Sequence, residues 1–311
     1  KKFWYNDNGG ITMNIREATW QGIGTTVSDC TNLDQVLKTS GLDYQVRKSP
    51  IYAENKILVD GKVATVREGD NHVYGIVSEN YEICQNRDAF DFVNYINDEI
   101  KFVKAGETLG GLVYIIAELP EVKVLGDSFK PHVIFQNGHN GGIAIKAAIC
   151  PLRIVCQNQF NLAFRDTQNT VVIRHNSTME GKLIDARNVL STTASYMDSL
   201  TKEAEKYASI KLSSERVSKL IEEFFPITGE MSERTVSTIT NKRNELLSAY
   251  MEDDNANFRG TVWGMINAAS DYISHCSPSR KSDNWQENKF VYVTFNPVFI
   301  NQFVQFVSER V

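Results

Sequence analysis

Residues 112–118 read LVYIIAE, and this apolar stretch, rich in β-branched residues, predicts a strand. Four further stretches around it have the same texture and are set apart by Gly, Pro and Asn; they are 73–78, 122–125, 132–136 and 143–149. Apolar residues on both sides of Asp60-Gly61 predict a hairpin with its turn at that pair. The region from 40 to 150 is therefore expected to be mainly antiparallel sheet.

Helices are predicted on either side of these strands. Leu33, Val36 and Leu37 form an apolar face between a cap-like Thr31 and a terminating Gly41, and a second helix is expected after residue 86. From 182 to 275 apolar residues recur every three or four positions, and Asn296-Pro297 opens a last helix. The predicted class is α+β: an antiparallel β-rich body with packed helices over 14–180, then a mostly helical region over 181–311.

Composition excludes several classes. The 311 residues are 42% hydrophobic and 23% charged, which is a globular composition rather than a disordered one. The net charge of -5 argues against a protein that covers duplex DNA through overall positive charge. No apolar run reaches the roughly 20 residues of a membrane span, and we expect no membrane partner. Five irregularly spaced cysteines predict no disulfide framework and favour the cytoplasm of a bacterial host cell.

The tripeptide Cys-Gln-Asn occurs twice, at 84–86 and at 156–158. The simpler interpretation is a strand that ends in a buried cysteine, followed by an asparagine that caps a helix. The alternative makes Cys156 a nucleophile, with His139 or His175 as its base. We predict no metal site and no cofactor, because no HExxH pattern, phosphate loop or GxSxG elbow is present.

Two segments are candidates for binding. The first is a Gly-rich hairpin loop that could approach an anion or a nucleic-acid backbone; it consists of Asn137, Gly138, His139, Asn140, Gly141 and Gly142. The second is the stretch 132–179, which has four positive side chains and one negative one, whereas 200–256 has eight positive and eleven negative. Its candidate nucleic-acid-binding residues are Lys146, Arg153, Arg165, Arg174 and His175, interleaved with Phe135, Phe160 and Phe164. The alternative is that the phenylalanines are core and the arginines are solvated or paired.

The ordered motifs resemble those of phage- and plasmid-like proteins grouped as domain of unknown function 932. The run PLRIVCQNQFNLA over 151–163 carries the resemblance, and 173–175, 20–24, 41–46 and 260–263 support it. The family typically has His-Asp-Gly where this chain has His139-Asn140-Gly141, which weakens a metal or acid–base role there but leaves a turn role intact. The resemblance implies a protein of a mobile element and no established activity.

Three functions are open at this point. The first is nucleic-acid binding in phage or plasmid DNA metabolism, with single-strand annealing and recombination as its specific form, because hairpins followed by a helix look like the cores of RecT-like and Redβ-like annealing proteins. The second is a host-interaction or anti-defence module that binds a host protein, and a homo-oligomer fits both. The third is a Cys156-dependent enzyme, although we regard a non-enzyme as the better expectation.

Overall fold

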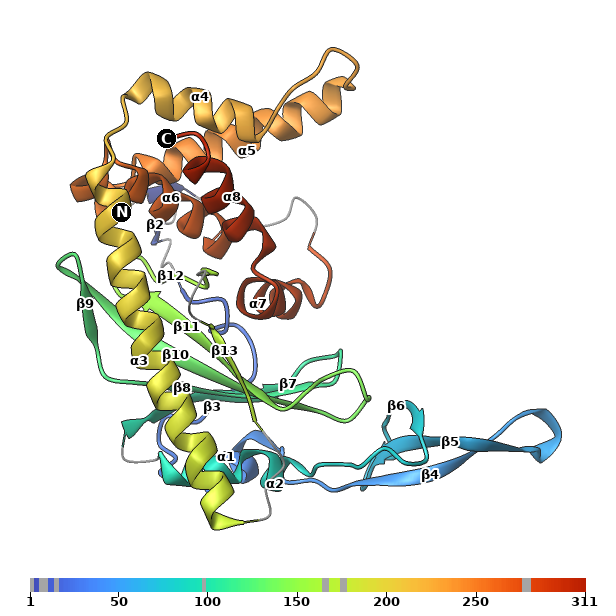
Figure 1. The fold of residues 1–311 in the computed structure, drawn as a ribbon. Helices are drawn as coiled ribbons and strands as arrows, with labels where there is room; N and C mark the ends of the chain where they lie inside the picture. Colours follow the sequence, from blue (N-terminus) through green and yellow to red (C-terminus); the bar gives the residue numbers. More distant parts are fainter. Residues whose placement is uncertain are drawn as a thin grey trace.

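The computed structural model describes residues 3–5, 11–13, 17–96, 99–163, 168–173, 178–275 and 281–311. It is an α+β structure, as predicted, with antiparallel sheets in the first half and most helices in the second (Figure 1). The strands are β1 Phe3–Tyr5, β2 Ile11–Met13, β3 Thr25–Thr26, β4 Val46–Tyr52, β5 Leu58–Arg67, β6 Val73–Ser78, β7 Lys101–Glu107, β8 Leu112–Glu118, β9 Val122–Val124, β10 Asp127–Gly138, β11 Lys146–Arg153, β12 Asn158–Gln159 and β13 Thr170–Val172.

The helical segments cover the remaining core. The α-helices are α1 Leu33–Ser40, α2 Asn86–Phe90, α3 Met179–Ser209, α4 Ser214–Phe224, α5 Glu233–Tyr250, α6 Val262–His275, α7 Trp285–Phe295 and α8 Val298–Ser308. Short 3-10 turns are η1 Glu54–Lys56, η2 Asp91–Tyr95 and η4 Asp253–Phe258. Local signals set several ends: the Asn32 side chain accepts from the Gln35 N–H at the start of α1, and Gly41 ends it with φ +71°.

The main sheet has the strand order β12-β11-β10-β8-β7-β3, with β13 also paired to β11 and β9 to β10. Its pairs are antiparallel, and Val133 of β10 lies opposite Ile149 of β11 and Ala117 of β8. Alternate residues of β8 enter different cores: Val113 and Ile115 pack with α1, α2 and the first half of α3, whereas the ring of Tyr114 meets Phe290 of α7. The unbroken apolar stretch is explained by this burial on both faces.

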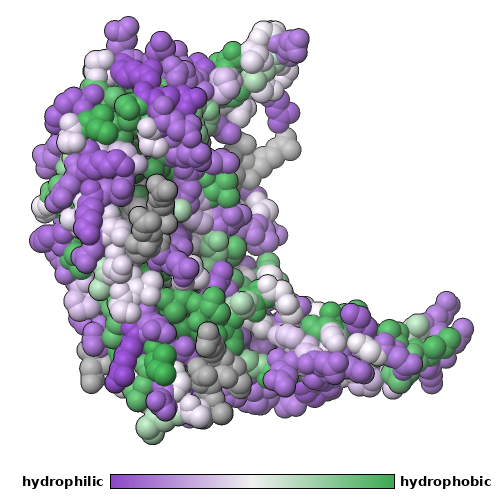
Figure 2. All heavy atoms as spheres, in the orientation of Figure 1, coloured by the Kyte–Doolittle hydropathy of each residue, from purple (hydrophilic) through white to green (hydrophobic). Residues whose placement is uncertain are grey.

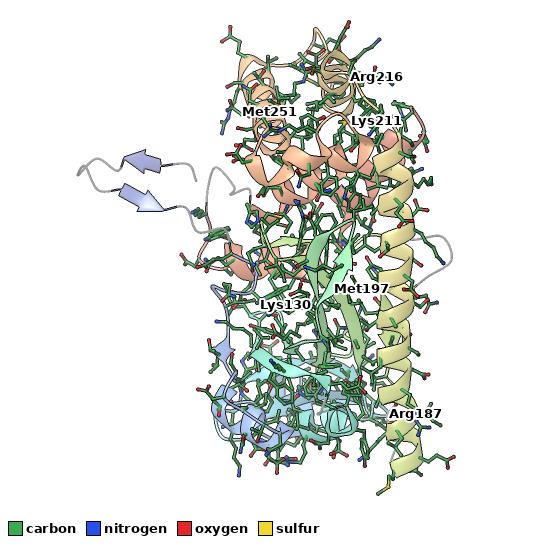
Figure 3. The ribbon with its side chains drawn as sticks, turned by 90° about the vertical axis from the view of Figure 1, so that its left-hand side faces the viewer. Lys130, Arg187, Met197, Lys211, Arg216 and Met251 are labelled. Carbon is green, nitrogen blue, oxygen red and sulfur yellow. The ribbon has the colours of Figure 1, made fainter. Side chains whose placement is uncertain are left out.

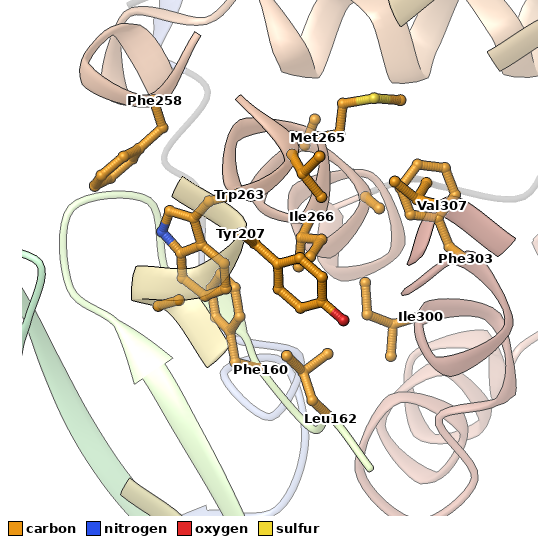
Figure 4. Close-up of a cluster of buried hydrophobic side chains, with 14 of the residues drawn as sticks. Phe160, Leu162, Tyr207, Phe258, Trp263, Met265, Ile266, Ile300, Phe303 and Val307 are labelled. Atoms are coloured by element: carbon orange, nitrogen blue, oxygen red, sulfur yellow. The ribbon is translucent and has the colours of Figure 1, made fainter. Parts of the chain in front are cut away.

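A third core joins one end of the sheet to the helical region (Figure 4). Phe160, which follows β12, packs its ring 5.6 Å from Trp263 of α6, and Ile300 and Phe303 of α8 complete the cluster. Helix α3 runs along the sheet and contributes to both this core and the one beside α1 (Figures 1 and 3). The helices from α4 to α8 therefore close over the sheet end, because the apolar faces of α3, α6 and α8 meet there.

A separate three-stranded sheet, β4-β5-β6, projects from the body, and we call residues 46–78 the arm (Figure 1). The predicted turn at Asp60-Gly61 is wrong, because both residues lie inside β5. The reversal is instead at Asn55 and Lys56, whose φ angles of 61° and 62° suit a tight hairpin turn. Gly61, with φ +70°, accommodates an irregularity in the strand.

The molecule has a concave side between the arm and the α4–α5 pair (Figure 2). Helix α7 faces this side in the same view (Figure 1). Within the described ranges, no helix taken singly is long and apolar enough to cross a bilayer; α7 and α8 meet that criterion only as a pair bent by 45°.

Candidate nucleic-acid interface

Arg153 is not part of an accessible basic surface, and that expectation was wrong. Its side chain is only 2% exposed and forms an ion pair of 2.5 Å with Asp127. The Nη2 atom of this ion pair also donates to the Asp254 carbonyl at 2.7 Å, Nε donates to the Asp127 carboxylate at 2.6 Å, and Nη1 lies 3.6 Å from the Cys156 sulfur. Position 153 faces inward in β11 and its cation is satisfied inside the protein, so it is unavailable to a phosphate.

Lys146 is placed differently from Arg153, although both lie on β11. Its side chain is partly exposed, and the ammonium nitrogen lies 5.7 Å from the ring centroid of Phe295, at the end of α7. Arg165, Arg174, His175 and Phe164 lie outside the described residues. Lys146 is thus the one member of the predicted basic set whose position on the surface can be given.

The phenylalanines expected to stack on bases belong to the core. Phe135 is fully buried with its ring centroid 5.4 Å from that of Phe92, and Phe160 is equally buried 5.2 Å from Phe129. Such rings are held by the packing of their neighbours and cannot receive a base. The interpretation of these aromatic residues as core is confirmed.

The Gly-rich segment 137–142 is mostly a packed connection between β10 and β11. Asn137 and His139 are buried, and both bond to the Asn86 side-chain oxygen at 3.0 Å. Asn140 accepts from the Gly142 N–H at 2.9 Å, which closes a turn, and the left-handed Gly141 lies against Val77 of the arm. Only Gly141 and Gly142 are fully exposed, so the segment fixes the root of the arm.

Helix α7 carries a basic–aromatic arrangement that sequence reasoning missed. The Lys281 nitrogen lies 4.6 Å from the ring centroid of Trp285, and the Lys289 nitrogen lies 5.9 Å from it. Trp285 and Lys289 are one turn apart on α7, whereas Lys281 precedes the helix and reaches the ring from the segment before it. The signal in the sequence is a tryptophan with a lysine four residues away on each side.

The same helix is anchored to the sheet on another side. Glu287 accepts a 2.9 Å hydrogen bond from the Leu109 N–H in the turn between β7 and β8, and Phe290 is buried against Tyr114. Asp283 is exposed beside the lysines, so the local charge is close to balanced. The surface therefore combines a partly exposed indole with flanking ammonium groups and is only weakly basic.

Cys156 lacks the properties of a nucleophile. The thiol is buried, and burial raises its pKa to about 12. His275 approaches the Cys156 carbonyl oxygen at 2.9 Å rather than the sulfur, and His139 bonds to Asn86. A thiol in this environment is structural, so the cysteine-enzyme hypothesis is not carried forward.

The asparagines of the two Cys-Gln-Asn tripeptides are not helix caps, contrary to prediction. Asn86 is the first residue of α2 and donates to the Leu42 carbonyl at 3.1 Å. Asn158 lies in β12, with its amide 2.9 Å from His275 Nε2 and 3.1 Å from Asp271. In the described part of the chain, no group of three or more His, Cys, Asp or Glu side chains could hold a metal ion.

These features define an α+β protein with a doubly covered antiparallel sheet, a projecting arm and a weakly basic, aromatic surface on α7. The chain belongs to the family described as Domain of unknown function (DUF932), whose model matches residues 73–291. The match spans the main sheet apart from β3, and also α3 and most of the helical region, including Trp285 and Lys289. No curated protein matches the chain, and no solved structure does.

Proposed function

We propose that this protein binds single-stranded nucleic acid along α7. The observation that carries the proposal is the Trp285 ring at the start of α7 with two lysine ammonium groups near it, that of Lys281 at 4.6 Å and that of Lys289 at 5.9 Å from the ring centroid. A partly exposed indole can stack with any base, while ammonium groups contact the flanking phosphates. The Lys146–Phe295 pair at the other end of α7 extends the same combination of a cation and a ring.

The dimensions suit a short segment of strand. Trp285 and Phe295 are ten residues apart, which is about 15 Å along a helix axis. A single strand can present unstacked bases to the two rings, whereas the bases of a duplex are occupied by their own stacking and pairing. The proposal is therefore for single strands, without sequence preference.

A weakly basic surface sets the expected salt dependence. With Lys281, Lys289 and Lys146 as phosphate contacts, the slope of log K against log salt should be about -2, since each contact on a single strand contributes about 0.7. Stacking would then supply much of the affinity. A role in single-strand annealing within phage or plasmid DNA metabolism is the finer form of the proposal, and the sheet crossed by the long helix α3 supports it by fold-level analogy.

The test is fluorescence anisotropy with a labelled single-stranded oligonucleotide at about 50 mM and about 200 mM salt. Trp285→Ala should weaken binding by about tenfold or more, because stacking on one ring contributes about 1–3 kcal/mol. Lys281→Gln with Lys289→Gln should reduce the salt slope. Arg187→Gln, which removes an exposed cation of α3 (Figure 3), is the matched control and should leave binding unchanged.

Absence of binding at low salt would contradict the proposal, and so would equal losses in Trp285→Ala and Arg187→Gln. Duplex DNA of the same length is the specificity control and should bind more weakly. For the finer proposal, the rate at which two complementary oligonucleotides pair should rise with the protein present and return to the protein-free rate with Trp285→Ala.

Protein binding is the second candidate function, and the exposed apolar side chains of the arm favour it. A host protein recovered at a stoichiometric ratio after nuclease treatment, and lost when the arm is substituted, would support this candidate. Recovery that depends on nucleic acid would favour the first.

A further inference from the structure

The arm exposes large apolar side chains that the rest of the chain leaves uncovered. Five of them lie between residues 52 and 76: Tyr52 is 57% exposed, Ile57 64%, Leu58 51%, Val73 55% and Ile76 63%. Burying such groups is favourable by about 25 cal/mol for each Å² removed from water. A cluster of this kind on a projecting element is typical of a protein interface.

Three of these side chains lie together at the tip of the arm. Tyr52 of β4 lies directly opposite Leu58 of β5, next to Ile57 at the turn, and residues directly opposite in an antiparallel pair project from the same side of the sheet. Ile76 lies further along, opposite Ala64, and Val73 lies opposite Val66 near the root. The tip of the arm therefore carries a compact apolar group.

Hydrogen bonds hold the root of the arm to the body, so the arm has a defined orientation. Arg67 donates to Glu107 of β7 at 3.0 Å, and Tyr44 donates to the same carboxylate oxygen at 2.9 Å. The Gln85 amide pairs with both backbone groups of Val46, at 2.8 and 2.9 Å. The apolar side chains are thus carried on an arm of fixed orientation, which borders the concave side in Figure 2.

Addition of a further strand to the arm is obstructed at both edges. Pro50 lacks an N–H in the edge strand β4, where the register also shifts. At the other edge, Gly75 and Val77 of β6 lie against Asn140 and Gly141 of the body. A partner can therefore contact the faces of the β4-β5-β6 sheet but cannot extend it at its edges.

The charges of the arm indicate which partner fits. The arm holds five basic and four acidic side chains, so its charge is close to balanced, and the signs alternate around the apolar tip at Glu54, Lys56, Asp60 and Lys62. A balanced, alternating surface is complementary to itself, whereas a strongly charged partner would need one sign. We infer that the arm of one molecule packs against the arm of a second copy of this chain.

Sedimentation velocity of the full chain, without nucleic acid, tests this inference over about a hundredfold range of concentration. The wild type should associate, and Leu58→Asp should weaken association by about tenfold or more. Val155→Asp is the matched control, because Val155 is 61% exposed outside the arm, and it should associate like the wild type. Circular dichroism and thermal unfolding should be unchanged in both variants.

A disulfide distinguishes arm-to-arm packing from other self-association. Leu58→Cys should form covalent dimers under mild oxidation, and Val155→Cys should not. A wild type that is monomeric throughout, or association untouched by Leu58→Asp, would overturn the inference. Association without a Leu58→Cys crosslink would overturn it too, since the arm would then meet a different surface. None of these results bears on α7, so the two proposals fail separately.

Discussion

The two Cys-Gln-Asn segments, 84–86 and 156–158, have the same sequence but connect different pairs of structural elements. In each, the asparagine side chain meets a distant histidine: Asn86 bonds to His139 at 3.0 Å, and Asn158 lies 2.9 Å from His275. The first pair joins α2 to the connection that follows β10, and the second joins α6 to β12. A short polar motif therefore joins separate layers of the fold twice, through a buried amide rather than through a helix cap.

The surroundings of the two histidines differ. His139 is enclosed by the rings of Tyr44 and Tyr74, at 6.1 and 5.1 Å, and its Nδ1 has no hydrogen-bond partner in the described structure. Burial lowers the pKa of His139 to about 4. His275 has Asp271 at 3.6 Å. The amide–imidazole contact is shared by the two sites, while the second adds the carboxylate of Asp271 beside its imidazole.

Asn86→Ala should have the largest effect. It removes the hydrogen bonds that the Asn86 side chain makes with the Asn137 amide, the His139 ring and the Leu42 carbonyl, although the Asn137 amide keeps its 3.2 Å bond to the Cys84 carbonyl. The expected loss is about 4 kcal/mol of unfolding free energy. Urea unfolding measures the loss, and limited proteolysis should show faster cleavage within the arm. Asn80→Ala, at an exposed position, is the control and should cost almost nothing.

Acidification should have the next largest effect and separates the two histidines. Because the folded pKa of His139 lies below the ordinary value of 6.5, the unfolded chain binds more protons between pH 6.5 and about 4. Stability should therefore fall as the pH falls through this window, by at most about 3 kcal/mol for this residue. His132, whose pKa burial also lowers to about 4, adds to the slope.

Unfolding free energies measured at a series of pH values check this prediction. His139→Gln should flatten the profile, whereas replacement of the exposed His72 by Gln should leave its shape unchanged. A wild-type profile that is flat from pH 6.5 to 4 would contradict it.

Asp271→Asn tests the second of the two sites, the contact of His275 with Asn158. The substitution keeps the size of the side chain but removes the charge that faces His275 and the Asn158 amide, so we expect a loss of about 2 kcal/mol. Thermal unfolding gives the change, and Asp198→Asn, on an exposed position of α3, is its control. Equal changes in the unfolding temperature of the two variants would mean that the Asp271 contact stabilises the protein no more than an exposed carboxylate does.

The cysteines of the two segments should show the smallest effect. Burial raises the pKa of both Cys84 and Cys156 to about 12. Alkylation at neutral pH should therefore be slow at both in the folded protein and fast after denaturation, as mass spectrometry of the peptides would show. Rapid labelling of folded Cys156 would revive a reactive role for that thiol.

Much of the architecture follows from local sequence. Residues 112–118 and 73–78 are strands as predicted, and Gly41 ends α1, because periodicity and glycine conformation act over a few residues. Gly61 shows the limit of such signals. The pair Asp60-Gly61 predicted a turn, but the positive φ of Gly61 serves a bulge as well as a turn, and the adjoining strands decide between them.

The candidate site was less predictable. Nothing within a few residues of Arg153 indicates that Asp127 and the carbonyl of Asp254 will surround it, because those partners are far away in the chain. Asn86 and Asn158 were predicted as caps for the same reason, since their histidines lie 53 and 117 residues further on. Trp285 was missed because the polar segment before it, 277–284, suggested a loop, although Lys281 and Lys289 stand four residues on either side of it in the sequence.

The double covering of the central sheet has a consequence for synthesis. Phe290 of α7 seals one face, and Phe303 and Val307 of α8 fill the core at its end. Both helices are synthesised after every strand of the sheet, so the strands keep exposed apolar side chains until α7 and α8 have emerged from the ribosome. Nascent chains arrested before α7 should accordingly recruit chaperones, and the native packing of the sheet should form only once α8 has emerged.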